Sequence, residues 1–184
     1  INPAMSVNVA TGTPDEAAEW AEYCADWYRE ADVEPPMVYW HIGNHPYHNT
    51  TAHMTPEMYA DVLHTFAPVV QDNYPNSRIV AVMANYNLAN DESEWKEAMF
   101  REAADLIDVV QVQTYGGCSP RADAISQARS VTERLQAFDD NMGSFINECR
   151  ERDVSWNAGI AEWNWWLQAS HWDGRDFEEP PKVL

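Results

Sequence analysis

Five short apolar segments alternate with four amphipathic ones along this 184-residue chain, and no hairpin turn signal interrupts the alternation. Short apolar segments predict buried strands, and segments whose apolar residues recur every three or four positions predict helices. The predicted strands are residues 6–9, 37–42, 78–83, 107–113 and 157–162, and the predicted helices are residues 14–31, 56–67, 92–103 and 122–149. Strands separated by helices pair in parallel, so the pattern predicts an α/β fold with a parallel sheet.

The helix starts carry local signals of their own. Thr13 and Thr55 each precede a proline, which suits the first helical position because its missing N–H is not needed there. Glu16 follows Thr13 at the spacing of a capping box. Within the second helix, Pro68 is expected to kink or end the helix. The first helix is expected to bury one apolar stripe, made of Ala17, Trp20, Ala21, Cys24, Trp27, Tyr28 and Ala31.

A (β/α)8 TIM barrel and a doubly wound sheet both satisfy this order of elements. The glycine-rich turns of nucleotide-binding folds, GxGxxG and GxxxxGK followed by Ser or Thr, do not occur in the sequence. Polar residues instead cluster after several predicted strands, which is the pattern of a barrel whose site lies at the carboxyl ends of its strands. These residues are Asn8, Asn44, His45, Asn85, Gln113, Tyr115, Glu162, Trp163 and Asn164.

The length of the chain bears on how much of a barrel it forms. A complete barrel needs roughly 250 residues. Residues 1–184 are therefore predicted to form one domain, a partial barrel that covers about five of the βα units. Because exposed strand edges are unfavourable, we expect further chain segments or a second copy in a homo-oligomer to complete the barrel.

The charge balance excludes several partners. Thirty Asp and Glu residues outnumber eleven Lys and Arg residues, which gives a net charge of −19. Nucleic acids and anionic membranes bind basic surfaces, so neither is an expected partner. The acidic surface is typical of a soluble protein or, alternatively, of a halophilic one, because salt screens the self-repulsion. No apolar stretch approaches the ~20 residues of a membrane span, and no signal peptide is visible, so a cytoplasmic location is predicted.

Glu162 is the strongest candidate for a catalytic group. It follows the apolar segment 158–161 and precedes Trp163, Asn164, Trp165 and Trp166. A carboxylate at the end of a buried strand is costly unless it lines a cleft, although a solvated loop glutamate is the alternative. The chain has nine tryptophans, and an indole ring packs well on the apolar face of a sugar. Asn44 could bind a substrate hydroxyl, and the phenol of Tyr115 could keep a nucleophilic carboxylate ionised.

Four segments of the chain resemble family 51 of the glycoside hydrolases, the α-L-arabinofuranosidases. Residues 7–24 read VNVATGTPDEAAEWAEYC and resemble the family segment N-x-GTGTPEEAAxWVEYC. Residues 39–46, YWHIGNHP, resemble the family strand YWEIGNE. Residues 113–115, QTY, match the tyrosine of HYY, and residues 160–164, IAEWN, resemble the EWN strand. The four segments occur in the family's order and span nearly the whole chain.

The resemblance implies a (β/α)8 barrel of which this chain covers the third to seventh strands. It also implies retaining hydrolysis of α-L-arabinofuranosides or related polysaccharide linkages, with Glu162 as nucleophile. Asn44 would then bind the 2-hydroxyl of the sugar, and Tyr115 would support Glu162. No cofactor is expected, and a carbohydrate is the expected substrate. The other residues predicted to line the substrate cleft are Trp40, His41, Trp163, Asn164 and Trp166.

His45 departs from the family pattern. The acid/base glutamate of the family falls on His45, and the other glutamate of the same strand falls on His41. Retaining chemistry uses two carboxyl groups about 5–5.5 Å apart. An imidazole can transfer protons near neutral pH, but as a cation it would pair with anionic Glu162 and blunt both roles. We therefore expect weak or altered activity.

Two alternatives follow from the same histidines. A barrel that has lost its acid/base carboxylate could bind carbohydrate without cleaving it. Alternatively, His41, His45 and His48 could hold zinc or copper, because His41 and His45 are four residues apart on one strand and would share a face. No HExxH motif supports this, and histidines hydrogen-bonded near the cleft are the simpler interpretation. The cysteines are predicted to be buried apolar residues rather than disulfides or zinc ligands: Cys24, Cys118 and Cys149.

Overall fold

In the residues that the structure describes, the chain forms one parallel five-stranded sheet with four helices. The computed structural model describes residues 2–47, 53–83, 94–118 and 124–167. For residues 112–118, 124, 127, 128, 130, 131, 134, 138 and 161–167 it describes the backbone alone. The elements are β1 (Ala4–Val7), α1 (Pro14–Glu30), β2 (Val38–Ile42), α2 (Pro56–Asn73), β3 (Ser77–Val82), α3 (Glu94–Glu102), β4 (Val109–Cys118), α4 (Ala124–Glu151) and β5 (Asn157–Leu167). The strands lie in the order β1-β2-β3-β4-β5, and every neighbouring pair is parallel. The predicted α/β class is confirmed.

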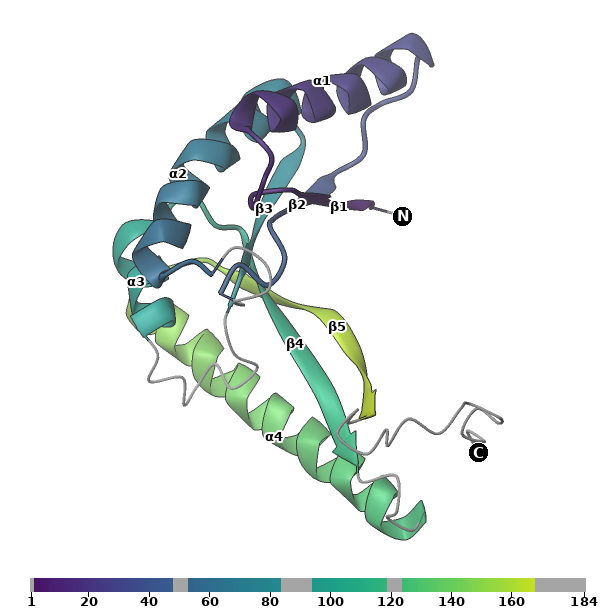
Figure 1. Ribbon diagram of the computed structural model, residues 1–184, viewed down its shortest axis with the longest axis vertical. Coiled ribbons are helices and arrows are strands. Elements are labelled where there is room, and N and C mark those ends of the chain that lie inside the picture. Colours follow the sequence, from purple (N-terminus) through teal and green to yellow (C-terminus); the bar gives the residue numbers. More distant parts are fainter. Residues whose placement is uncertain (1, 48–52, 84–93, 119–123, 168–184) are drawn as a thin grey trace.

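The helices lie along one face of the sheet (Figure 1). A doubly wound sheet carries helices on both faces, so this placement is that of a barrel wall. Burial alternates accordingly along β2: Val38, Trp40 and Ile42 are buried, whereas Tyr39 and His41 are only partly buried. We call the face that carries Tyr39 and His41, opposite the helices, the inner face.

The helix starts follow the predicted capping chemistry. Thr13 has extended backbone, its hydroxyl accepts the N–H of Glu16 at 3.2 Å, and its own N–H donates to the Glu16 carboxylate at 2.7 Å. Thr55 caps α2 in the same way by accepting the N–H of Met58 at 3.3 Å. Of the two outcomes expected at Pro68, a kink or the end of the helix, the second is wrong, because α2 continues to Asn73. Packing of buried residues on both sides of the proline, such as Phe66 and Val70, outweighs the one lost backbone bond.

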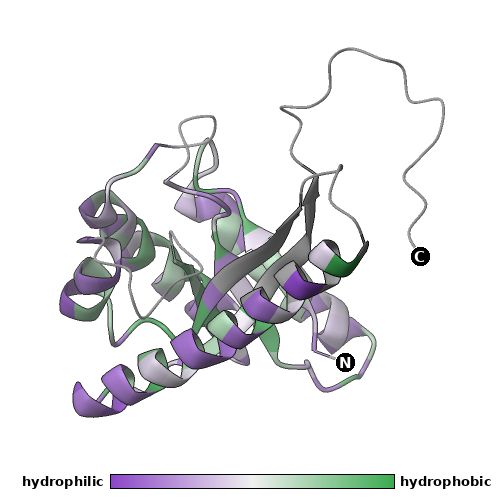
Figure 2. Ribbon diagram, turned by 90° about the horizontal axis from the view of Figure 1, so that it is seen from below, coloured by the Kyte–Doolittle hydropathy of each residue, from purple (hydrophilic) through white to green (hydrophobic). Residues whose placement is uncertain are grey.

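The apolar stripe predicted for α1 is buried only in part. Ala17 and Ala21 are buried and Cys24 and Tyr28 pack against the core, whereas Trp20 and Trp27 are 59% and 56% exposed. On α4, Ile125 and Leu135 are also exposed. Much of α4 is coloured hydrophilic in Figure 2, as expected for an acidic, solvent-facing helix. No helix in the described ranges combines the length and apolarity that crossing a bilayer requires.

The last two strands are longer than predicted. The expected ends were Gln113 and Glu162, but β4 runs to Cys118 and β5 to Leu167. Beyond an irregularity between Val112 and Gln113, the two strands stay paired up to Cys118 and Leu167. The polar residues near Gln113 and Glu162 suggested that β4 and β5 end there. Backbone hydrogen bonds between the two strands, however, keep these polar segments extended as well.

Candidate active site

The site begins at the turn after β2. Gly43 has a φ of +83°, and a Cβ there would lie only 2.6 Å from Cγ2 of Val9. Its N–H donates to the carbonyl of Val7 at 3.1 Å. A glycine is needed for this close approach, because only glycine adopts such a backbone without strain. The turn places Asn44 and His45 at the carboxyl end of the sheet.

His45 is held by a series of aromatic contacts. Its φ is +47°, and its Nδ1 lies 3.2 Å from the hydroxyl of Tyr47. The Tyr47 ring meets the Trp95 ring edge-on at 5.7 Å, and Trp95 stacks on buried Tyr59 at 5.3 Å. A continuous series of side-chain contacts therefore connects buried Tyr59 to the imidazole of His45 through Trp95 and Tyr47. The prediction that His41 and His45 share a strand face is wrong, because β2 ends at Ile42 and the chain turns at Gly43.

The base of the site lies on the inner face of the sheet. His41 of β2 and Gln111 of β4 are joined by a hydrogen bond of 2.5 Å between Nδ1 and Oε1. With Ser6, Gly43 and Asn44 they line a hollow of about 230 Å³ at the strand ends. A second hollow of about 430 Å³ lies deeper on the same face and also contains both residues. The His41–Gln111 pair is thus a wall common to both hollows.

Glu162 and Tyr115 lie within strands rather than after them. The backbone of Glu162 is paired with Gln113, and that of Tyr115 with Asn164. The side chains of Tyr115, Glu162, Trp163, Asn164 and Trp166 lie outside the described part of the structure. The register ties Glu162 to its neighbours on the sheet. One row of the sheet joins His41 through Val80 and Val109 to Asn157. Glu162 pairs with Gln113 beyond this row, and His45 follows His41 beyond the turn at Gly43, so both lie on the carboxyl side of the row.

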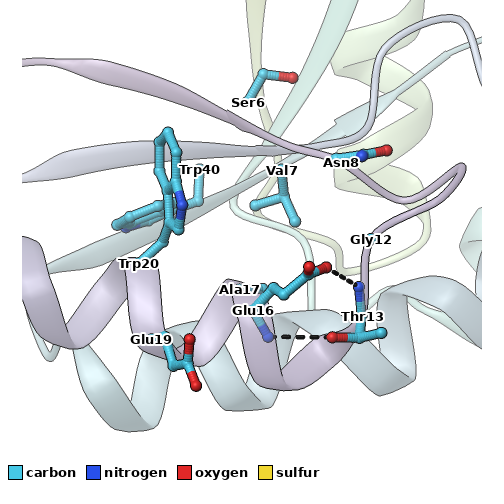
Figure 3. A pocket seen from close by; sticks show the side chains of 10 residues that line it. All are labelled: Ser6, Val7, Asn8, Gly12, Thr13, Glu16, Ala17, Glu19, Trp20 and Trp40. Carbon is cyan, nitrogen blue, oxygen red and sulfur yellow. Dashed lines mark hydrogen bonds between the residues drawn. The ribbon is translucent and has the colours of Figure 1, made fainter.

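Trp40 does not belong to this site, contrary to the sequence prediction. Its side chain is 1% exposed and lies on the helix-facing side of β2, edge-on to Tyr74 at 6.0 Å. Alternation along the strand places it opposite His41. It borders another hollow, about 530 Å³, between β1 and α1 (Figure 3). There Trp20 and Trp40 lie at one end, and the Thr13–Glu16 capping bonds lie at the other.

Sequence reasoning missed four residues that build the site. Tyr47, Tyr59 and Trp95 support His45, and Gln111 contacts His41. A signal for Gln111 existed, since it is a polar residue inside an apolar strand segment, 109–112. The aromatic residues had no signal beyond apolar periodicity.

The metal alternative finds no support in the described residues. Within the described ranges, no three His, Cys, Asp or Glu side chains are grouped so that they could hold an ion. His48, the predicted third ligand, lies outside those ranges, as does Asn85. The Nδ1 atoms of His41 and His45 are each within hydrogen-bond distance of another side chain.

The fold is a partial (β/α)8 barrel, and the solved structures that it resembles include glycoside hydrolases. Neither a family model nor a curated protein matches the chain. Among solved structures, its similarity is to family 51 arabinofuranosidases, which confirms the resemblance seen in the sequence at the level of structure. The α-L-arabinofuranosidase of Thermotoga maritima in complex with arabinose is 28% identical, with a TM-score of 0.63 over 90% of this chain and 35% of that one.

Two further similar structures are described as members of glycoside hydrolase family 51 (GH51). The GH51 α-L-arabinofuranosidase of Thermotoga petrophila is 28% identical, with a TM-score of 0.63, and matches 90% of this chain and 35% of its own. The GH51 arabinofuranosidase of Xanthomonas axonopodis pv. citri is 21% identical, with a TM-score of 0.69 over 90% of this chain and 37% of that one, and this match bears on the fold alone. The chain spans about a third of the length of these structures.

Proposed function

We propose that the chain forms the central part of the catalytic barrel of a retaining glycoside hydrolase that cleaves α-L-arabinofuranosides. The observation that carries the proposal is that His45 and Glu162 both lie on the carboxyl side of the sheet row that joins His41 to Asn157. The likeness to arabinofuranosidases at 28% identity supports the substrate class. The hollow that Asn44 lines together with His41 and Gln111 offers hydrogen-bonding side chains to a sugar.

In this mechanism Glu162 attacks the anomeric carbon of the sugar. The bond from that carbon to the leaving oxygen breaks, and the oxygen takes a proton from an acid in the cleft. A water molecule then displaces Glu162 from the covalent intermediate and gives its proton to the group that had protonated the leaving oxygen, which regenerates the acid. Asn44 would hold the 2-hydroxyl, and Tyr115 would hydrogen-bond the Glu162 carboxylate.

His45 would supply the proton in place of a carboxylic acid. Its Nδ1 faces the Tyr47 hydroxyl at 3.2 Å, so proton transfer to the sugar would run through Nε2. An imidazolium beside an ionised Glu162 stabilises both charges, which makes the acid weaker and the nucleophile less reactive. The enzyme should therefore favour substrates whose leaving groups need little protonation.

The test is hydrolysis of 4-nitrophenyl α-L-arabinofuranoside by the full-length protein and by its Glu162→Gln variant. This aryl leaving group departs with little acid assistance, so the nucleophile alone should give measurable turnover. Loss of hydrolysis in Glu162→Gln supports the proposal. The matched control is Glu133→Gln, which makes the same substitution at an exposed glutamate of α4. Equal hydrolysis by the Glu162→Gln variant and the parent would refute the assignment of the nucleophile.

A second candidate function is carbohydrate binding without cleavage. The histidine at position 45 favours it, because removal of general acid–base help typically lowers rates by about 10²–10⁴. This candidate predicts that methyl α-L-arabinofuranoside or an arabino-oligosaccharide binds, while activated aryl glycosides remain intact. Calorimetric titration alongside the hydrolysis assay separates the two functions.

A further inference from the structure

Two polar side chains, those of His41 and Gln111, meet across the middle strand of the sheet. His41 is on β2 and Gln111 on β4, and β3 runs between these strands. Val80 of β3 pairs with His41 and lines the same inner hollow as both residues. Gln111 pairs with Val82, so the hydrogen bond between Nδ1 and Oε1 spans β3 diagonally and joins β2 to β4. A contact between residues 70 positions apart depends on the fold and not on local sequence.

The chemistry of the pair sets where the imidazole carries its proton. The side-chain oxygen of Gln111 can only accept a hydrogen bond. With that oxygen as its partner, Nδ1 of His41 would carry the proton, and a neutral imidazole protonated on Nδ1 has an acceptor at Nε2. Gln111 is only 3% exposed, and a buried amide without a partner is costly, so the pairing is strongly favoured.

The location of His41 would allow its Nε2 atom to accept a hydrogen bond from a bound ligand. The imidazole is partly exposed, and it borders the hollow that also contains Ser6, Gly43 and Asn44. Asn44 is the residue proposed to hold a sugar hydroxyl. A ligand bound beneath Asn44 would therefore bring its hydroxyl groups to His41, which can accept a hydrogen bond but, while neutral with Nδ1 protonated, cannot donate one from Nε2.

We propose that Gln111 is a positioning residue that holds His41 with its proton on Nδ1, so that Nε2 accepts a hydrogen bond from a hydroxyl group of the bound pentofuranoside. The identity of the ligand rests on the proposed function, whereas the protonation pattern of His41 does not. Gln111 acts through His41 and does not itself touch the reacting atoms. The pair selects sugars that present a hydroxyl donor at this position.

Nitrogen NMR of the imidazole tests the first half of the proposal. In the full-length protein, Nδ1 of His41 should be protonated and Nε2 unprotonated, and the Nε2 resonance should move when methyl α-L-arabinofuranoside is added. Gln111→Met keeps the length of the side chain but removes the acceptor, so part of the proton should shift to Nε2. A parent protein with the proton on Nε2, or a Gln111→Met variant with an unchanged spectrum, overturns the proposal.

Kinetics test the second half. Loss of one neutral hydrogen bond should raise KM for 4-nitrophenyl α-L-arabinofuranoside about three- to tenfold in Gln111→Met, with a smaller change in kcat. His41→Phe should have a similar effect, and the double variant should be no worse than either one, because both changes remove the same interaction. Gln136→Met is the matched control, since Gln136 is an exposed residue of α4. Additive effects, or an unchanged KM in a folded Gln111→Met variant, overturn the proposal.

The outcomes separate this inference from the proposed function. Hydrolysis with no effect of Gln111→Met on KM leaves the proposed function standing and removes the role of Gln111. Binding of methyl α-L-arabinofuranoside that moves the His41 resonance, without any hydrolysis, supports the role of the pair and overturns the hydrolase. If Gln111→Met does not fold, as judged from its thermal unfolding, His41→Phe and the spectrum of the parent decide the matter.

Discussion

The hydroxyl of Tyr59 accepts the backbone N–H of Val82 at 2.8 Å and donates its own proton to the carbonyl of Ile42, also at 2.8 Å. One buried side chain of α2 thereby joins the ends of β2 and β3, immediately below the turn that carries His45. The indole N–H of Trp95 donates to the carbonyl of Val82 at 3.0 Å, and its ring stacks on Tyr59. Tyr59 thus couples the stability of the core to the geometry of the site.

Tyr59→Phe should destabilise the protein. It removes both hydrogen bonds and leaves buried backbone groups with fewer partners, which typically costs about 1–3 kcal/mol. Denaturant unfolding measures the effect. Tyr23→Phe is the matched control, because Tyr23 is 72% exposed and should tolerate the same change. A midpoint of unfolding for Tyr59→Phe equal to that of Tyr23→Phe would contradict this role of the hydroxyl.

Stability should fall at alkaline pH, in part through the same tyrosine. Burial raises the pKa of the Tyr59 hydroxyl well above its ordinary value, against a smaller opposite effect of the Val82 N–H. In the unfolded chain a tyrosine loses its proton near a pKa of about 10. The folded state is favoured fully below that pH, and its advantage decreases as the pH rises toward the folded pKa. Denaturant unfolding between about pH 8 and pH 11 should show a steeper decline for the parent than for Tyr59→Phe. Parallel declines would contradict the assignment.

Gly43→Ala should impair both folding and any activity of the site. The added Cβ would sit 2.6 Å from Val9 at a positive φ, and a left-handed backbone alone costs a non-glycine residue about 1–2 kcal/mol. Gly143→Ala is the matched control, because a Cβ there has no atom within 4 Å. In the middle of α4 that change should stabilise the protein by about 0.5–1 kcal/mol. Thermal unfolding of the two variants should therefore shift in opposite directions.

The ion pair between Lys96 and Glu148 should matter more than the other charged contacts of the surface. Lys96 Nζ lies 2.7 Å from the Glu148 carboxylate, and its side chain is only 8% exposed. Removing one partner of a buried pair leaves an uncompensated charge, which typically costs about 3–5 kcal/mol. Glu148→Gln should therefore destabilise more than Glu133→Gln in denaturant unfolding. The double variant Lys96→Met/Glu148→Gln should recover part of the loss. If Glu148→Gln and Glu133→Gln unfold at the same midpoint, the pair contributes nothing measurable.

Local features were predictable from the sequence, and features set by pairing between distant strands were not. The Thr13–Glu16 capping box needs only four consecutive residues, so the start of α1 could be predicted correctly. The ends of β4 and β5 depend on each other's backbone, and polarity alone placed them too early. Trp40 and His41 were both predicted to line the cleft, yet alternation along β2 places the two side chains on opposite faces. Gln111 was not predicted to belong to the site, because its hydrogen-bond partner, His41, is on another strand.

His45→Glu should reveal whether the absence of a carboxyl group at position 45 limits the rate of hydrolysis. A glutamate restores a neutral acid that is not electrostatically paired with Glu162, and such acid–base help is typically worth about 10²–10⁴ in rate. The gain should appear with alkyl arabinofuranosides, whose leaving oxygen must be protonated, and should be small with the 4-nitrophenyl substrate. Glutamate at position 45 also loses the contact between the imidazole and the Tyr47 hydroxyl, so Tyr47→Phe is the control for altered positioning. A gain on alkyl glycosides in His45→Glu that Tyr47→Phe does not reproduce identifies proton donation as the limiting step. A fall in rate on both substrates would instead show that the histidine is the functional acid, and that Tyr47 is there to orient it.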